Sequence, residues 1–372
     1  MQLSLPVVAL YVSLNNYKRV MIAMAKKEFE VRDLCGLIKE IPVDNQIITA
    51  MDLFNTTIKC STFKFEFDKV RQPRQAAFGQ YPRYGEQMGT ITSDERETDT
   101  ADMAFTAASA MIVPSDYQGI RKPGSDAEEN LESVTARRIV QLGEGLKQTH
   151  EEARQLALFE NKIILQGAGE KAKVLDVCDL LGAQQTTSAV DTAKDILKQL
   201  QDVVALSKVK QRGIVKHLRG FTLFCKADLF TAIQTDELLR KVLLFGNQNI
   251  TDKGILFPED LLPGFPTFRI PGLALRVVQM DSLPENTAYL VPQFRPYAMG
   301  DMGVYNQFFG PCARNIQLAN GKAMEAFMYM EESRSKREIF VESSYAFMNM
   351  LPEAVVKITV SNSAAAALAK AK

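Results

Sequence analysis

The sequence predicts a mixed α+β protein built around one long helix, and three patterns indicate this. Residues 135–171 (TARRIVQLGEGLKQTHEEARQLALFENKIILQGAGEK) carry apolar side chains at helical spacing, and the pattern extends from about 127 to 166. Residues 54–70 (FNTTIKCSTFKFEFDKV) alternate apolar and polar side chains, which is typical of strands. After residue 169, short strand patterns alternate with helical ones, and long strand patterns return near the C-terminus.

Bulk composition excludes several classes of function. The 372 residues, of which 46% are hydrophobic, are enough for one large or two smaller domains. Lys+Arg and Asp+Glu are equal at 44 each, so the whole chain has no charge bias toward nucleic acid or membranes. Five scattered cysteines suit a reducing compartment, and two histidines leave almost no material for a metal site or a catalytic triad. Catalysis would therefore have to rest on carboxylates or lysine. We expect no enzyme, no cofactor and no metal, with one nucleotide-dependent alternative considered below.

The N-terminal 23 residues have two interpretations. Their apolar run, residues 3–14, is interrupted by Pro6 and is too short to span a bilayer. Its positive charges follow the run instead of preceding it, which disfavours a secretory signal. The alternative is that translation begins at Met24, in which case residues 1–23 are a non-native extension.

Residues 24–55 have short, mixed patterns and are predicted to form an N-terminal arm, whereas residues 56–90 are predicted to form an extended loop. In the loop, the apolar face shifts by one residue before Phe63, Phe65 and Phe67, which indicates a bulge or bend. Pro and Gly then interrupt about thirty residues that lack a core-forming pattern. A strand pair that leaves the body and needs a neighbour to cover it explains both features.

Two groups of charged residues follow the phenylalanines. Cations alternate with aromatic residues at Arg71, Arg74, Phe78, Tyr81, Arg83 and Tyr84. This pattern suits single-stranded nucleic acid or a neighbouring protein, and the balanced overall charge favours protein. The acidic run Asp94, Glu95, Glu97, Asp99 and Asp102 lacks the glycine and terminal glutamate of a calcium loop, so we predict a solvated loop.

The long helix, about 60 Å from 127 to 166 at 1.5 Å per residue, carries an apolar stripe that includes Val134, Ile139 and Leu146. Gly143 and Gly145 are poor helix formers and mark a bend or a close-packing point. His150 has no partners for a metal site, so a structural polar contact on the helix surface is favoured.

The stretch Gly167–Lys171 (GAGEK) has two interpretations. A nucleotide-dependent enzyme would need a strand, a longer glycine loop and then a helix start. Here the glycines follow a predicted helix, so a helix cap is favoured over a phosphate site.

An ordered set of motifs resembles the major capsid (head) proteins of lambda-like tailed phages, the E family, which have the Hong Kong 97-type fold. The motifs are PSDYQGIRKPG (114–124), THEEARQLALFENKIIL (149–165), FTLFCKADLFTAIQTDELLRKVL (221–243), TAYLVPQF (287–294), FFGPC (308–312) and IFVESSYAFMNMLPEAVVKITVS (339–361). The last of these is the most specific, because it looks like the family's C-terminal strand, serine-rich turn and Pro-Glu-x-x-Val ending.

The resemblance implies a peripheral domain from residues 91–168 and 321–361, which contains the long "spine" helix. It also implies an axial domain from 169–320, an extended loop and a flexible tail at 362–372. Some relatives cross-link through lysine and asparagine, but nothing marks Lys59, Lys64 or Lys69 as reactive, and no cross-link is predicted.

The resemblance also implies a function, that of a shell of hexamers and pentamers in an icosahedral head. Such a shell assembles in the host cytoplasm around a separate scaffold and expands as double-stranded DNA is packaged. Its partners are itself, a portal, the scaffold, in some relatives a decoration protein, and DNA contacted weakly on the inner face, with no membrane. The phenylalanines would lie over an adjacent subunit, and Arg71, Arg74 and Arg83 would pair with carboxylates there. Those carboxylates would be on a neighbour's helix, at Glu144, Glu151 and Glu152.

Three alternatives stay open on the sequence. An encapsulin-like compartment shares the fold, and a cargo gene in place of portal and terminase genes would identify it. A nucleotide-dependent enzyme would bind a nucleotide through Gly167–Lys171. A nucleic-acid binder would use residues 71–84 and show salt-sensitive binding as a monomer.

Overall fold

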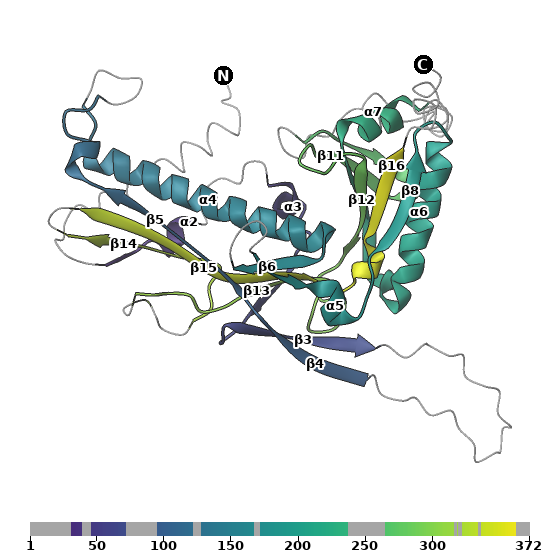
Figure 1. Cartoon of the computed structure of the whole chain (residues 1–372), viewed down its shortest axis with the longest axis horizontal. Coiled ribbons are helices and arrows are strands. Elements are labelled where there is room, and N and C mark those ends of the chain that lie inside the picture. Colours follow the sequence, from purple (N-terminus) through teal and green to yellow (C-terminus); the bar gives the residue numbers. More distant parts are fainter. Residues whose placement is uncertain are drawn as a thin grey trace, which may run out of the picture.

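The computed structural model describes residues 31–38, 46–71, 95–121, 128–166, 172–236, 265–315, 318, 322–333 and 336–361. Figure 1 shows an elongated lobe, which contains the long helix α4 (Leu131–Phe159), beside a more compact lobe. We call them the peripheral and axial lobes. A two-stranded hairpin projects from their junction. The α+β class is confirmed.

The peripheral lobe is a six-stranded sheet with α4 lying along one face. Its strands are β1 (Arg32–Asp33), β2 (Thr56–Lys59), β5 (Ala104–Ile112), β13 (Tyr305–Phe309), β14 (Phe327–Glu332) and β15 (Arg337–Asn349). The long β15 pairs antiparallel with β5 along one side and with β14 and β13 along the other. Alternate residues of β15 turn Ile339 and Val341 toward α4, where they pack with Val134, Ile139 and Leu146. The predicted apolar stripe is confirmed in this half of the helix.

The axial lobe is a second six-stranded sheet. Its strands, in spatial order, are β10 (Thr267–Ile270), β11 (Leu275–Gln279), β9 (Leu218–Cys225), β12 (Thr287–Phe294), β16 (Val356–Ser361) and β8 (Thr186–Asp191). Helices α6 (Ile196–Lys210) and α7 (Ala227–Thr235) pack on the face that carries Leu223 and Leu290. The opposite face, with Phe224 and Tyr289, is also buried. Burial on both faces explains why β9 is apolar from Phe221 to Cys225 apart from Thr222.

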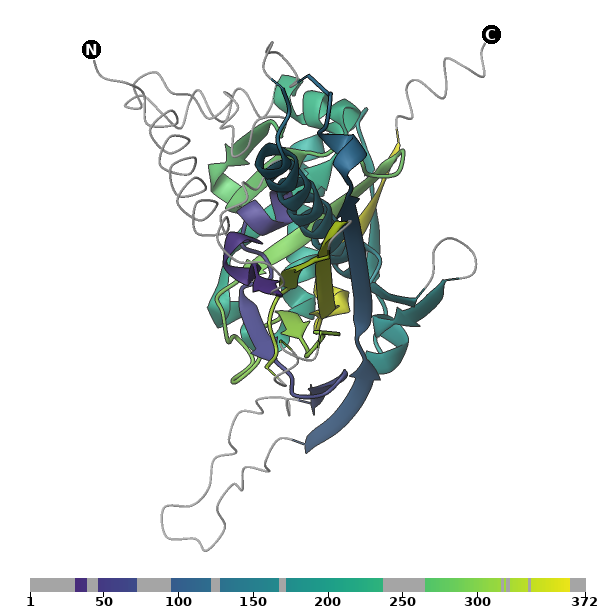
Figure 2. The same ribbon diagram turned by 90° about the vertical axis from the view of Figure 1, so that its left-hand side faces the viewer.

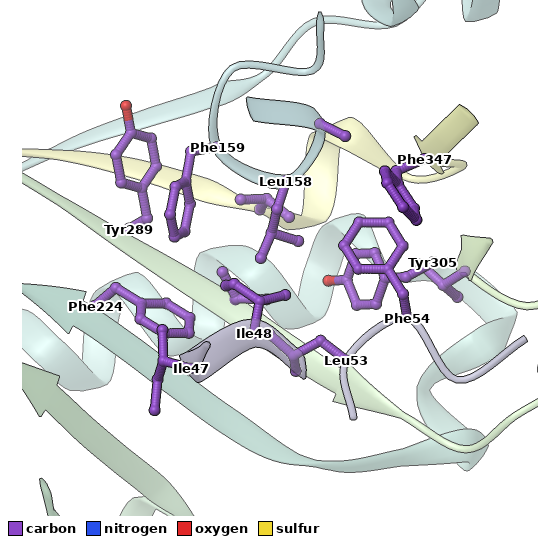
Figure 3. Packing of buried hydrophobic residues seen from close by; sticks show 14 of the residues in the cluster. Ile47, Ile48, Leu53, Phe54, Leu158, Phe159, Phe224, Tyr289, Tyr305 and Phe347 are labelled. Atoms are coloured by element: carbon purple, nitrogen blue, oxygen red, sulfur yellow. The ribbon is translucent and has the colours of Figure 1, made fainter. Parts of the chain in front are cut away.

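A shared core joins the two lobes (Figure 3). Phe159, at the end of α4, stacks on Tyr289 of the axial sheet at 4.7 Å between ring centroids. The Tyr305 hydroxyl, from the peripheral sheet, donates to the Pro292 carbonyl of the axial sheet at 2.9 Å. Ile47 and Ile48 of the short helix α3 (Ile47–Ala50) fill the space between. The lobes are therefore held together by packed side chains, not by a linker alone.

The remaining elements are short. They are α2 (Cys35–Ile38), α5 (Val177–Leu181), the hairpin strands β3 (Lys64–Arg71) and β4 (Glu95–Asp102), the hairpin strands β6 (Lys162–Gln166) and β7 (Lys173–Asp176), and the 3-10 turns Pro114–Asp116, Arg212–His217, Pro271–Leu273 and Pro352–Ala354. The predicted break in residues 54–70 is confirmed, because β2 and β3 lie in different sheets.

The long helix is shorter than predicted at both ends. Asn130 caps its start, with the side-chain oxygen 2.8 Å from the Ser133 amide. At its end, Asn161 adopts a left-handed conformation with φ 56°, which stops the helix. The β-branched residues that follow then form β6. The predicted helix cap at the 167–171 glycines is therefore wrong, since the helix ends at Phe159.

The sheets divide the chain differently from the predicted domain boundaries. β13 was expected in the axial domain but pairs with β15 of the peripheral sheet. β16 was expected in the peripheral domain but lies between β12 and β8 of the axial sheet. The second strand of the projecting hairpin, β4, was also expected in the peripheral domain, but it pairs with β3 of the predicted extended loop. The predicted arm of residues 24–55 is described only in part, and residues 1–23 and 362–372 lie outside the described residues.

Candidate assembly surfaces

The projecting hairpin buries two of the three phenylalanines that were predicted to contact a neighbour. Phe65 and Phe67 are 0% and 1% exposed. Phe65 packs on Phe308 of the peripheral sheet at 4.6 Å between ring centroids. Both side chains belong to a core beneath that sheet, together with Met348. The prediction that they cover an adjacent subunit is therefore wrong, because their own chain already covers them.

Phe63 differs from the other two. It lies at the root of the hairpin, where its carbonyl accepts a hydrogen bond from the Met103 amide at 3.0 Å. Its side chain is 69% exposed, so the ring faces solvent in the isolated chain. Among the three phenylalanines, only Phe63 remains available to a neighbour.

Opposite charges line the hairpin. Lys69 of β3 pairs with Asp99 of β4 at 3.0 Å, and the Thr98 hydroxyl donates to Asp68 at 2.7 Å. The Lys69 ammonium holds the pKa of Asp99 below its ordinary value. The acidic run that was predicted to be a solvated loop is therefore a strand from Glu95 onward, because residues 95–102 pair with β3. Asp99 and Asp102 also have lysine partners across the strands, at 3.0 Å and 3.9 Å. Within the described ranges, no group of acidic, His or Cys side chains is placed to hold a metal ion.

Of the predicted cations, the structure describes the backbone of Arg71. Arg71 ends β3, but its side chain, Arg74 and Arg83 lie outside the described residues. Their pairing with a neighbour stays a prediction.

Glu151 is not the surface carboxylate that was predicted. It is 0% exposed, and it accepts hydrogen bonds from the Ile48 amide at 2.6 Å and from the Thr49 hydroxyl at 2.7 Å. Its carboxylate therefore stabilises the first turn of α3, whose amides have no partner within that helix. Intersubunit contact through Glu151 is excluded by this burial. Glu144 and Glu152 are exposed, and their role at an interface stays a prediction.

Arg154, one helical turn after Glu151, extends the same contact. Its guanidinium donates to the Thr49 hydroxyl oxygen at 2.9 Å and to the Gln307 amide oxygen at 3.2 Å. It also lies 4.6 Å from the centre of the Phe347 ring. Together, Glu151 and Arg154 fasten the arm residues around α3 to the spine helix and to the peripheral sheet. We call this contact the arm latch.

His150 is buried beside the arm latch. Its Nε2 lies 3.0 Å from the Ser343 hydroxyl, which itself donates to the Glu325 carbonyl at 2.6 Å. The Ser343 oxygen therefore accepts a hydrogen bond from a neutral imidazole that is protonated on Nε2. The predicted structural polar contact is confirmed, but the predicted surface position is wrong. Burial, with a smaller effect of Arg154, lowers the His150 pKa to about 3.

This lowered pKa predicts a pH dependence of stability. Below the ordinary pKa of about 6.5 the unfolded chain binds a proton that folded His150 does not, so stability falls by about 1.4 kcal/mol per pH unit. The loss ends near the folded pKa, about 3. Urea unfolding of wild type and His150→Gln at pH 7 and pH 5 measures the effect. We expect wild type to lose about 2 kcal/mol more than the variant over this interval.

The comparison is between wild type and His150→Gln, so every other titrating group is common to both proteins. Equal pH dependence of wild type and His150→Gln would contradict the neutral, buried imidazole.

Gly143 and Gly145 lie inside α4, which continues through both without interruption (Figure 1). Gly143 is buried and Gly145 is exposed. A bend of the spine at these residues stays a prediction.

Strands β6 and β7, an antiparallel pair, flank the Gly167–Lys171 stretch, which itself lies outside the described residues. A phosphate-binding loop of the Walker type connects a strand to the start of a helix. Since a strand follows here, the flanking elements do not supply the helix start that such a loop needs.

Sequence reasoning missed several exposed apolar side chains. They are Phe105 and Met111 on β5, Val209 on α6, Val215 in the turn after α6, and Tyr297 after β12. Phe105 and Met111 share one face of β5 because they are an even number of residues apart. That spacing was visible in the sequence. Which face of β5 meets solvent could be assigned only from the position of α4, which covers the opposite face.

No helix among the described residues is long and apolar enough to cross a membrane.

These features define the class by fold: a spine helix along a long-stranded sheet, a second sheet lobe, and a projecting hairpin. No protein-family model matches the sequence, and no curated protein matches it either. Among solved structures, the putative capsid protein of a prophage of E. coli CFT073 matches with a TM-score of 0.52 at 10% identity. That alignment covers 89% of this chain and 100% of that one.

Two cyanophage capsid proteins match with lower scores. The P-SCSP1u capsid has a TM-score of 0.47 at 9% identity, covering 82% of this chain and 86% of that chain. The A-1(L) capsid has a TM-score of 0.46 at 13% identity, covering 86% and 93%. The assignment of fold rests on the prophage protein. The chain has the Hong Kong 97-type capsid fold.

Proposed function

We propose that this chain is the major capsid protein of a tailed-phage-type head. In this role it is a structural subunit that assembles with copies of itself into an icosahedral shell of hexamers and pentamers around double-stranded DNA. The observation that carries the proposal is the fold match to a putative capsid protein over that protein's whole length. The alignment also covers 89% of this chain.

The exposed residues suggest where neighbouring copies meet. Phe63 presents an apolar ring beside the charged hairpin, and such a ring at an interface centre contributes strongly to binding. Glu144 and Glu152 lie on the exposed side of the spine helix. We assign them as the carboxylates that face a neighbour's Arg71, Arg74 and Arg83. Glu151 is excluded from this set because its side chain is buried.

The remaining partners follow from the proposed role. A scaffold would set the size of the shell, a portal would occupy one vertex, and a decoration protein would add to the outer surface. DNA would be contacted weakly, in keeping with the balanced charge of the chain. The shell would assemble in the host cytoplasm and expand on packaging, and a bend of the spine at Gly143 and Gly145 would accommodate the change in curvature.

Replacing Phe63 with aspartate tests the proposed interface. The side chain is 69% exposed, so the monomer is expected to fold as wild type does. The charge would be buried without a partner at the interface, so we expect loss of closed shells in electron micrographs and subunits at the position of small species in sedimentation.

Phe63→Leu is the matched control, because it keeps an apolar side chain, and it is expected to form shells. Normal shells from Phe63→Asp would remove Phe63 from the interface.

A further inference from the structure

In the part of the chain that the structure describes, β5 is an open edge of the peripheral sheet. Among the described residues it pairs only with β15, over nine residues from Ala104 to Ile112. Figure 2 shows it along the margin of the lobe. Alternate amides and carbonyls on its outer side therefore have no strand partner in the part of the chain that the structure describes.

The composition of β5 does not prevent pairing with a strand of another chain. Its sequence, AFTAASAMI, has no charged residue, no proline and no glycine. Natural edge strands usually carry such residues, because an unprotected edge pairs with other chains. Phe105 and Met111, 42% and 52% exposed, add two large apolar side chains on the face opposite α4. An edge of this kind is suited to a strand from another molecule.

We propose that β5 pairs antiparallel with β5 of a second copy, around a twofold axis at Ala108. In this register Phe105 lies opposite the partner's Met111, and Ala107 lies opposite the partner's Ser109. Aromatic and methionine side chains attract each other, and no like charges meet along the pair. The two sheets would then form one continuous sheet across two subunits.

Charges beside the strand select this register. The Arg314 guanidinium lies 4.8 Å from the centre of the Phe105 ring. Glu338 is the cross-strand neighbour of Met111, on the same face of the sheet. Within the subunit, Arg314 pairs with Glu342 at 3.4 Å and Glu338 pairs with Lys336 at 3.0 Å. The proposed pairing adds the approach of Arg314 to the partner's Glu338, twice by symmetry. A register centred on Phe105 would instead bring two Arg314 side chains together, and one centred on Met111 would bring two Glu338 side chains together.

This pairing rests on the proposed shell, because the twofold axes of an icosahedral lattice relate neighbouring capsomers by contacts of this self-complementary type. A failure of the β5 pairing can nevertheless be distinguished from a failure of the proposed shell. A shell can assemble through the hairpin alone, in which case β5 would stay unpaired.

Cysteine cross-linking tests the pairing in assembled shells. Ala108→Cys places one thiol from each copy beside the axis, and mild oxidation with oxidised glutathione is expected to make a covalent dimer the main species after denaturation. Ala189→Cys is the matched control, since Ala189 is also an exposed alanine on an edge strand, β8. We expect it to stay monomeric. Wild-type shells that form while Ala108→Cys gives no dimer would overturn the pairing and leave the shell intact. Absence of wild-type shells under all conditions would instead count against the proposed function.

A charge experiment provides a second measurement. Ala107→Lys with Ser109→Lys places lysines opposite each other and is expected to abolish shells while the monomer keeps its circular dichroism spectrum. Ala107→Lys with Ser109→Glu places opposite charges across the axis and is expected to restore them. Equal assembly of both double variants would contradict the register.

Discussion

Replacing Glu151 with alanine is expected to lower the free energy of unfolding by about 3–5 kcal/mol, the usual result of removing one partner from a buried charged contact. The carboxylate is fully buried and accepts three hydrogen bonds, from the Ile48 and Thr49 amides and from the Thr49 hydroxyl. Its removal would leave these donors unsatisfied, and the buried Arg154 guanidinium would lose one of the two carboxylates that favour its charge, the other being Glu325. Urea unfolding of the isolated subunit measures the loss.

Glu152→Ala is the control, since Glu152 is the next residue on the same helix and is exposed. Its carboxylate accepts a hydrogen bond from the Gln148 side chain at 3.0 Å. We expect a change within about 0.5 kcal/mol, as for most surface substitutions. Equal effects of the two alanine variants would contradict the arm latch.

Replacing Phe65 with alanine is expected to destabilise the subunit by about 3–5 kcal/mol, the range for a large aromatic side chain lost from a core. The ring is fully buried and contacts Phe308 at 4.6 Å and Phe67 at 5.8 Å between centroids. The variant would leave a cavity where the hairpin joins the peripheral sheet. Thermal and urea unfolding both measure the change.

Phe63→Ala, two residues away, is expected to change subunit stability by no more than about 0.5 kcal/mol. Its effect would appear in assembly instead, because its ring is exposed in the single subunit. If Phe63→Ala and Phe65→Ala destabilised the subunit equally, the distinction between core and interface phenylalanines would be wrong.

The strands of the axial lobe were the most predictable part of the fold. β9, β11 and β12 are short segments rich in apolar residues, and most of their residues are buried. Their pairing partners were not predictable in the same way. β16 inserts between β12 and β8, whose residues lie far away in the sequence, and local patterns carry no information on such pairings.

The errors at the spine helix have local causes. The helix stops at Asn161, whose left-handed conformation is a common helix end. The asparagine and the β-branched Ile163 and Ile164 after it were a recognisable stop signal, but the prediction followed the apolar pattern, which continues past them. His150 and Glu151 were assigned to the surface because they are polar. Their helical phase continues the stripe from Leu146, which is the signal that would have placed them inside.

The phenylalanines of the hairpin show the limit of strand patterns. Alternation correctly indicated one apolar face for Phe65 and Phe67, but it does not say whether that face meets the same chain or another one. The answer depends on Phe308 and Met348, which are more than two hundred residues away in the sequence. Surfaces between copies have the same property, which is why Phe63 and β5 require assembly experiments.

Electron microscopy of the chain, expressed together with its genomic neighbours so that a scaffold is supplied, tests the central proposal most directly. We predict closed particles of uniform diameter whose surfaces resolve into rings of five and six copies of this chain. A subunit that stays monomeric in that lysate, with no closed particles at any concentration, would contradict the assignment as a shell protein.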